Sequence, residues 1–301
     1  MKRPSLTRRR VCSAAALWLT ASLALTGCAD NLSGSEVPTS GGSASMAAVE
    51  PSQELFAQLP ADVQQSKKIV VGNSPTYKPV EFLEGGRTAG LDIDLFNAVG
   101  KRLGVAVEWQ QSPFDQILIG IQAKKYDVGV SAFTVTKERE QSVTMVSYLS
   151  AGSLWAVRKG NPDGLEAGRP CGRTIAVQTG TVQEQEMKAA QKGCGSNRIK
   201  LLSFTDQGEA TAALVNGRAQ AIAADSPIAL YAIKMSGDSI EQLGEPYDAA
   251  PYGVVVPKEQ TQFAEAIRQA YVDLRASGHY DAILATWNQS DGAVDAFEVN
   301  P

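Results

Sequence analysis

The stretch that decides the fold runs from Tyr126 to Arg139 and reads YDVGVSAFTVTKER. Residues 127–131 form a short apolar run, which predicts a strand. The stretch ends in the charged run Lys137-Glu138-Arg139. By itself such a run indicates a solvated surface, so Arg139 needs further support before it counts as a binding residue.

On both sides of this stretch, short apolar runs alternate with segments of helical periodicity. We predict strands at residues 69–71, 105–109, 174–177, 199–204, 220–224 and 253–256. Helices are predicted at 91–103, where Gly104 ends the helix, and at 263–274, before Gly278. Another helix is predicted to begin at Ser112-Pro113, with the serine as cap and the proline as first helical residue. Three more are predicted to begin near Thr181, after the capping pair Asp206 and Glu209, and at Ser226-Pro227. This alternation predicts an α/β fold with parallel or mixed sheets flanked by helices.

The N-terminus reads as an export signal. A basic stretch ends at Arg10, an apolar run covers residues 11–25, and small residues lead to Cys28. The run is shorter than the roughly 20 residues that span a bilayer, which favours a cleaved signal over a membrane helix. Cleavage elsewhere, with Cys28 uninvolved, is the alternative, and Arg8-Arg9 is a weak match to a twin-arginine signal. Residues 28–65, rich in Ser, Gly and Ala at their start, are assigned to a flexible tether.

Charge and composition exclude several function classes. The 301 residues carry a formal net charge of −4, and five of the 28 Lys and Arg residues precede Cys28. The rest of the chain is therefore more acidic, which argues against nucleic-acid binding. Beyond Cys28 the remaining cysteines are Cys171 and Cys194, and His279 is the one histidine. Export favours a Cys171–Cys194 disulfide over two buried thiols. Two cysteines and one histidine are too few ligands for a zinc site, so we predict no metal site.

No sequence motif points to a cofactor or a nucleophile. The chain contains no P-loop, no dinucleotide glycine fingerprint and no nucleophile elbow, because Phe133 replaces the last glycine of the elbow. Any catalytic triad would have to use His279, which is predicted to lie near a helix end. We therefore predict no cofactor and no enzymatic activity, although an acid–base enzyme that uses carboxylates stays open.

Four motifs resemble those of the polar amino-acid-binding proteins of ABC importers, solute-binding family 3. They occur in the family's order and spacing between Lys67 and Trp287: GNSPTYKPVEF at 72–82 with GLDIDL at 90–95, YD with SAFTVTKER at 126–139, VQTGT at 177–181, and ADSP at 224–227. The resemblance implies a two-lobe periplasmic-binding-protein-like fold of type II with two hinge strands. Lobe 1 would comprise residues 66–148 and 253–290, lobe 2 residues 154–247, and residues 291–301 would be a C-terminal tail. LTGC at 25–28 likewise resembles a lipobox, with Cys28 lipidated.

The resemblance also implies a ligand site in the cleft between the lobes. Arginine matches a carboxylate in a planar two-pronged geometry, so Arg139 is expected to bind the ligand's carboxylate, with Thr134 and the free N–H groups at Gly180-Thr181 beside it. Asp225 is expected to bind the ammonium group, with the Ala132 carbonyl nearby. Tyr77 and Phe114 would enclose the aliphatic part. The structural alternatives are a solvated Arg139, Asp225 or Thr181 as helix caps, and core aromatic residues.

Two further cleft positions, Ser74 and Gln178, bear on specificity. Family members that bind basic amino acids carry an acid at the position of Ser74, and glutamine binders carry a lysine at Gln178 and a histidine at Ala224. Since a buried cation needs a counter-charge, we predict a neutral, polar amino acid as ligand.

These features together predict a monomeric receptor anchored by lipid on the extracytoplasmic face of the cell membrane. It would deliver an amino acid to ABC permease subunits driven by a separate ATPase. One alternative is an enzyme on the same scaffold, similar to cyclohexadienyl dehydratase, with Glu81 as the candidate acid. The other is a ligand-sensing module for a receptor.

Overall fold

The structure is a computed structural model that describes residues 48–301. The predicted signal at residues 1–27, the lipidated Cys28 and the start of the tether lie outside the described residues. An eight-stranded mixed sheet, in the order β5-β1-β6-β11-β7-β10-β8-β9, runs through the described chain, and a three-stranded sheet has the order β2-β3-β4. The predicted α/β class is therefore confirmed.

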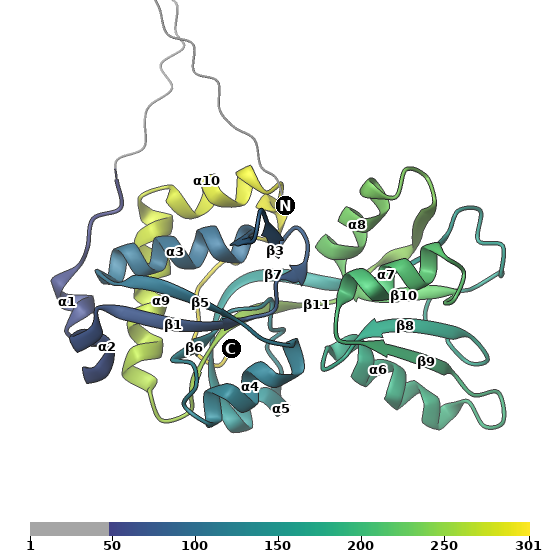
Figure 1. Ribbon diagram of the computed structural model, residues 1–301, viewed down its shortest axis with the longest axis horizontal. Coiled ribbons are helices and arrows are strands. Elements are labelled where there is room, and N and C mark those ends of the chain that lie inside the picture. Colours follow the sequence, from purple (N-terminus) through teal and green to yellow (C-terminus); the bar gives the residue numbers. More distant parts are fainter. Residues whose placement is uncertain (1–47) are drawn as a thin grey trace, which may run out of the picture. The chain divides into compact units, whose positions relative to one another are not determined.

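One half of the large sheet consists of strands near the N-terminus. They are β1 (Lys68–Asn73), β5 (Ala106–Gln111) and β6 (Val128–Gly129). Figure 1 shows α3 (Leu91–Leu103), α9 (Thr261–Ala276) and α10 (His279–Thr286) on one side of these strands, with α4 (Phe114–Gln122) and α5 (Lys137–Ser142) on the other. The large apolar core of this half includes Phe96, Tyr148, Tyr252 and Tyr271, all fully buried.

The other half of the sheet is built from β8 (Thr174–Gln178), β9 (Lys200–Phe204) and β10 (Ala221–Asp225). Its helices are α6 (Val182–Ala190), α7 (Gln207–Val215) and α8 (Ser226–Met235), with the short 3₁₀ turn η1 (Gln191–Gly193) after α6. Two smaller clusters, one around Trp155 and one around Leu214, form its core.

Two long antiparallel strands join the halves. They are β7 (Val143–Arg158) and β11 (Ile240–Pro257), and Figure 1 shows them crossing from one half to the other. Their pairing shifts register at three places between Leu243 and Gly253, so the ladder is irregular where the strands cross. The lobe boundaries drawn from the sequence, at residues 148–154 and 247–253, fall within these strands. This arrangement of two halves and two crossing strands agrees with the predicted two-lobe fold.

Several local predictions need correction. Ser112 does not cap α4. The helix begins at Phe114, its N-cap residue is Pro113, and no side chain makes a capping hydrogen bond to the first turn. Residues 53–65, assigned to the tether, form α1 (Gln53–Phe56) and most of α2 (Ala61–Ser66). Leu55, Leu59 and Val63 of this segment are at most 4% exposed in the core. Their four-residue spacing was a helical signal in the sequence, although they lie in α1, in the turn after it and in α2 and not on one helix face.

The segment expected to be a C-terminal tail packs against the first half. After the 3₁₀ turn η2 (Ser290–Gly292), Val299 forms an antiparallel bridge with Val146 of β7, and Ser147 N donates to Glu298 O at 2.9 Å. Phe297 is buried between the rings of Tyr271 and Tyr280. The segment thus pairs with the outer edge of β7, which would otherwise expose unpaired backbone groups.

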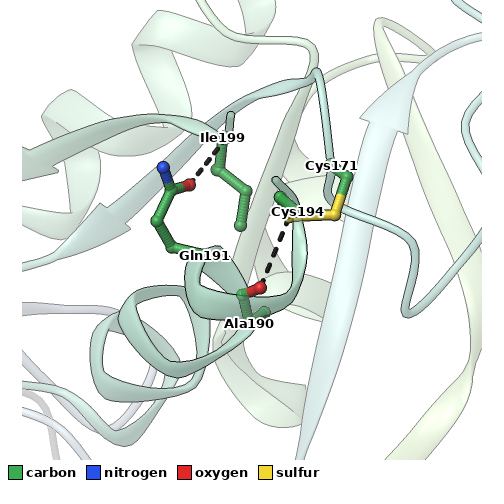
Figure 2. The surroundings of a disulfide bond; sticks show 5 residues. All are labelled: Cys171, Ala190, Gln191, Cys194 and Ile199. Atoms are coloured by element: carbon green, nitrogen blue, oxygen red, sulfur yellow. Dashed lines mark hydrogen bonds between the residues drawn. A yellow bond between two sulfur atoms is a disulfide. The ribbon is translucent and has the colours of Figure 1, made fainter. Parts of the chain in front are cut away.

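Cys171 and Cys194 form the predicted disulfide, with their Cα atoms 5.3 Å apart. Figure 2 shows the bond beside the end of α6, where Ile199 N donates to Gln191 Oε1 at 2.7 Å. Closing this 23-residue separation stabilises the second half by about 3 kcal/mol, mainly by restricting the unfolded chain.

Candidate ligand-binding cleft

A small, partly enclosed cavity of about 10 Å³ lies between the two halves. All nine residues that the sequence analysis assigned to ligand binding line it: Ser74, Tyr77, Phe114, Ala132, Thr134, Arg139, Gln178, Thr181 and Asp225. Four further lining residues were not assigned to ligand binding: Glu81, Ser131, Val182 and Gln183. Residues far apart in the sequence, from both halves of the sheet, therefore meet at one small space.

Arg139 is buried, at 7% exposure, and among residues 48–301 no carboxylate forms an ion pair with it. Its Nη1 donates to Thr134 O at 2.6 Å and its Nη2 to Gly180 O at 3.0 Å. The guanidinium carbon lies 5.6 Å from the ring centroid of Phe114 and 5.4 Å from that of Phe133, and these rings stack on each other. Burial lowers the pKa of Arg139 to about 10, so it remains a cation at neutral pH.

The backbone around Arg139 fixes its position. Thr136 caps α5, and its Oγ1 accepts a hydrogen bond from Arg139 N at 3.2 Å. A guanidinium has five N–H donors, and two of those in Arg139 are occupied by backbone carbonyls. The side chain is thus held in place while donors remain for an anion in the cavity.

Asp225 comes from the opposite wall, at the end of β10. It is the cap residue of α8, but its side chain makes no capping bond. Instead its carboxylate accepts from Tyr77 Oη at 3.0 Å, Tyr252 Oη at 2.8 Å and Gln183 Nε2 at 2.7 Å. Burial raises the pKa of Asp225, and these hydrogen bonds oppose the rise. The helix-cap alternative therefore does not account for this side chain.

Tyr77 lies on the strand β2 (Thr76–Tyr77), in the small sheet with β3 (Glu81–Glu84) and β4 (Arg87–Ala89). Besides donating to the Asp225 carboxylate, its hydroxyl accepts from Asp225 N at 3.3 Å. Because Tyr77 belongs to the first half and Asp225 to the second, this pair links the two walls. Phe114 packs its ring toward Arg139, so the two aromatic residues do more than enclose an aliphatic chain.

Glu81 is a second buried carboxylate in the cavity wall, at 1% exposure. It accepts from Asn73 Nδ2 at 3.0 Å and Ser74 N at 3.2 Å, and Ser131 Oγ also donates to it. Burial, followed by the nearby charge of Asp92, raises its pKa. An acid therefore lies beside Ser74 although Ser74 itself is neutral. In the sequence Glu81 was noted only as the candidate acid of an enzyme, within the motif GNSPTYKPVEF.

The turn before α6 differs from the prediction of free N–H groups. Gly180 N donates to Glu184 Oε2 at 3.0 Å, and Thr181 Oγ1 caps α6 by accepting from Glu184 N at 3.2 Å. Thr181 Oγ1 also donates to Gln178 O at 2.7 Å, while Gln178 Nε2 donates to Thr205 O at 3.2 Å. Glu184 thus already satisfies the Gly180 N–H, which leaves less of this turn for an anion.

Behind the cavity, Asp92 holds the loop that carries Ala132. Ala132 N donates to Asp92 Oδ2 at 2.9 Å and Tyr148 Oη to Oδ1 at 2.7 Å. Ala132 has a φ of +47°, so this bond secures a backbone conformation that is uncommon for a residue with a side chain. Burial raises the pKa of Asp92 to about 7.

Within residues 48–301, no group of three or more His, Cys, Asp or Glu side chains is placed to hold a metal ion. No helix in the same part of the chain is long and apolar enough to cross a membrane.

The sequence of this chain is similar to those of known amino-acid-binding proteins. Residues 69–290 match the model of the bacterial extracellular solute-binding proteins, family 3. The chain is 32% identical over 256 residues to the arginine-binding protein ArgT of Corynebacterium glutamicum, covering 83% of this chain and 84% of that one. It is 27% identical over 249 residues to the histidine-binding periplasmic protein of Salmonella typhimurium, covering 78% and 91%.

Solved structures give the same result. An ancestral arginine-binding protein bound to arginine matches with a TM-score of 0.70 and 32% identity, covering 73% of this chain and 98% of that one. The ancestral amino acid-binding protein AncCDT-1, a precursor of cyclohexadienyl dehydratase, matches with a TM-score of 0.68 and 29% identity, covering 75% and 97%. The predicted family is confirmed: this chain belongs to the bacterial extracellular solute-binding proteins of family 3, and it is an amino-acid-binding protein with the type II fold.

Proposed function

We propose that this protein is the extracytoplasmic receptor of an ABC amino-acid importer and captures one free amino acid in its cleft. The observation that supports this most is the pairing of opposite charges across one cavity. Arg139 lines one wall and Asp225 the other, and both are less than 10% exposed. A free amino acid carries one positive and one negative pole, so it can neutralise both buried groups at once.

In this proposal the remaining donors of Arg139 bind the α-carboxylate, with Thr134 and Thr181 beside it. The α-ammonium group binds Asp225 and the carbonyl oxygen of Ala132. A carboxylate has about four acceptor sites, and three donors reach Asp225, so one site is left for the ammonium group. Tyr77 and Phe114 line the space between these two groups.

The side chain of the ligand then reaches the end of the cavity formed by Ser74, Glu81 and Ser131. The sequence argument for a neutral ligand depended on the absence of an acid at Ser74, and Glu81 removes the reason for excluding a basic one. A cationic side chain would pair with ionised Glu81, whereas a neutral amide would accept from its protonated form. We therefore propose an amino acid whose side chain forms hydrogen bonds with Glu81, with L-arginine and L-glutamine as the cases to compare.

The proposal places the receptor outside the cytoplasm, anchored through lipidated Cys28, as a monomer. Residues 66–148 with 253–290 would move as lobe 1 and residues 154–247 as lobe 2, closing over the ligand by a hinge in β7 and β11. The permease and its ATPase would be separate chains. A sensor that reports the ligand to a receptor would use the same cleft.

One observation favours a second candidate, an enzyme on this scaffold. Glu81 is a buried acid with a raised pKa in the cavity wall, and a structural neighbour is described as a precursor of cyclohexadienyl dehydratase. Such an enzyme would turn over cyclohexadienyl acids. Incubation with these acids and detection of an aromatic product would support the enzyme, and absence of turnover would favour the receptor.

A thermal-shift screen against the twenty amino acids tests the receptor proposal. We expect one amino acid, or a small related group, to raise the midpoint of unfolding, since a ligand that binds only the folded state stabilises it. The Arg139→Ala variant should give no shift with the same compound. A wild-type protein that no amino acid stabilises would contradict the proposal.

A further inference from the structure

Gly180, in the turn between β8 and α6, packs closely against the first half. Its φ is +84°, and a Cβ placed on it would lie 2.9 Å from Cβ and 3.1 Å from Cα of Asp115. Asp115 and Phe114 form the first turn of α4, on the opposite side of the cleft. Real Cβ atoms essentially never come within 3.0 Å of another heavy atom, so this contact requires a residue without a side chain.

The same residue carries a hydrogen bond across the cleft. Arg139 Nη2 donates to Gly180 O at 3.0 Å, and Arg139 belongs to α5 in the first half. Gly180 therefore contacts the first half twice, by packing against α4 and by accepting from Arg139. A displacement of this turn would disturb the side chain proposed to bind the carboxylate.

Neither side of the contact can move aside at low cost. On the side of Gly180, its N–H donates to Glu184 Oε2, while Ser203 Oγ and Lys188 Nζ hold the Glu184 carboxylate at 2.6 and 3.0 Å. On the other side, the closest atoms include the Cα of Asp115, which belongs to the backbone of a helix. A side chain at position 180 would thus be accommodated by separating the two walls.

We propose that Gly180 is a positioning residue that sets how far the lobes close. Its bare backbone lets the turn before α6 seat against α4, and any side chain there holds the cleft partly open. Arg139 and Asp225 then lie too far apart for one amino acid to reach both. This inference rests on the proposed closure of the lobes around a ligand.

The test compares Gly180→Ala with a control glycine that has the same backbone strain. Gly160 has a φ of +75°, and a Cβ there would meet no atom within 4 Å. Gly160→Ala therefore introduces the strain of a positive φ without an obstruction. A third variant, Gly180→Asn, tolerates positive φ better than alanine but also carries a Cβ.

Closure is measured in the full chain by double electron–electron resonance, which gives the distance between two spin labels. The labels are attached to unnatural amino acids at the exposed positions 101 and 192. The distance is recorded without ligand and with L-arginine or L-glutamine. We expect Gly180→Ala and Gly180→Asn to lose most of the short-distance population and to bind about tenfold or more weakly, because only the closed form binds tightly. Gly160→Ala should match the wild type in both measurements.

Distance distributions of Gly180→Ala that equal those of the wild type would overturn the inference. So would a smaller loss in Gly180→Asn than in Gly180→Ala, because that order indicates strain and not obstruction. If the wild type binds neither amino acid, the proposed ligand is wrong, yet the distances without ligand still decide the role of Gly180. Should Gly180→Ala unfold, Gly180→Asn supplies the same comparison.

Discussion

The two walls of the cleft hold opposite charges by different means. Arg139 is held by two backbone carbonyls and by the faces of Phe114 and Phe133, whereas Asp225 is held by two tyrosine hydroxyls and one side-chain amide. Within residues 48–301 the two form no ion pair with each other. Each charge is thus positioned by neutral groups and stays available to a ligand.

The difference predicts how each wall tolerates substitution. The hydrogen-bond acceptors of Arg139 are backbone carbonyls, and a neutral side chain at position 139 would have no cationic donors for them. The partners of Asp225 are side-chain donors, so an isosteric amide can keep some of them. Loss of the arginine should therefore cost more than neutralisation of the aspartate.

Arg139→Ala is expected to have the largest effect. Removing one partner of a buried charged pair costs roughly 2–5 kcal/mol, so affinity for the amino acid should fall by about 100-fold or more. Isothermal titration calorimetry with L-arginine and L-glutamine measures it. Arg139→Lys is the matched control, which keeps the charge but loses the planar fork and should give an intermediate loss. Unchanged affinity in Arg139→Ala would remove this residue from the carboxylate role.

Asp225→Asn should weaken amino-acid binding by about tenfold or more, because the amide keeps the shape but not the charge that faces the ammonium group. The deaminated analogue of the same amino acid has no ammonium group, so its affinity should change little. Calorimetry with both compounds separates the two effects. Equal losses for both would show that Asp225 acts on the structure of the cleft and not on the ammonium group.

Glu81→Gln tests the proposed contact between Glu81 and the side chain of the ligand. If the ligand is cationic, this variant should lower affinity for L-arginine by about tenfold and leave L-glutamine nearly unchanged, because only the cation needs the charge. Equal affinities of wild type and variant for both amino acids would place the ligand's side chain elsewhere.

The smallest expected effect concerns Asp92, which supports the wall behind Ala132. The pKa of Asp92 is raised from 3.8 to about 7 by burial, so the folded protein holds this proton more tightly than the unfolded chain. The resulting stability is fully present below about pH 4 and is lost as the pH rises to about 7. Asp92→Asn should flatten the decline in unfolding free energy between these values, with only a modest change in affinity.

Denaturant unfolding at several pH values measures this dependence. Glu81, whose pKa is also raised, keeps its own share in the variant, so the slope should decrease without vanishing. An unchanged slope in Asp92→Asn would show that Asp92 does not titrate in this range.

The sequence identified the charged residues of the cleft better than their partners. Arg139 and Asp225 stand in motifs with a recognisable order, and apolar periodicity located most strands and helices. Glu81 was predicted only as the acid of an enzyme and not as a ligand-binding residue, because the hairpin of β3 and β4 is short and carries little alternation, so no pattern placed its carboxylate beside Ser74. The Gly180 N–H was expected to be free because its acceptor, Glu184, folds back from the next helix. The contact of Glu81 joins separate segments, which local patterns do not show, whereas that of Glu184 follows the capping-box spacing Thr181-x-x-Glu184 and could have been predicted.

A crystal structure of the protein with the amino acid that gives the largest thermal shift tests the central claim most directly. The account predicts the α-carboxylate oxygens within about 3 Å of the Arg139 guanidinium and the ammonium nitrogen within about 3 Å of the Asp225 carboxylate, in one closed cleft. An amino acid bound with its two poles reversed, or bound without contact to one of these two side chains, would contradict it.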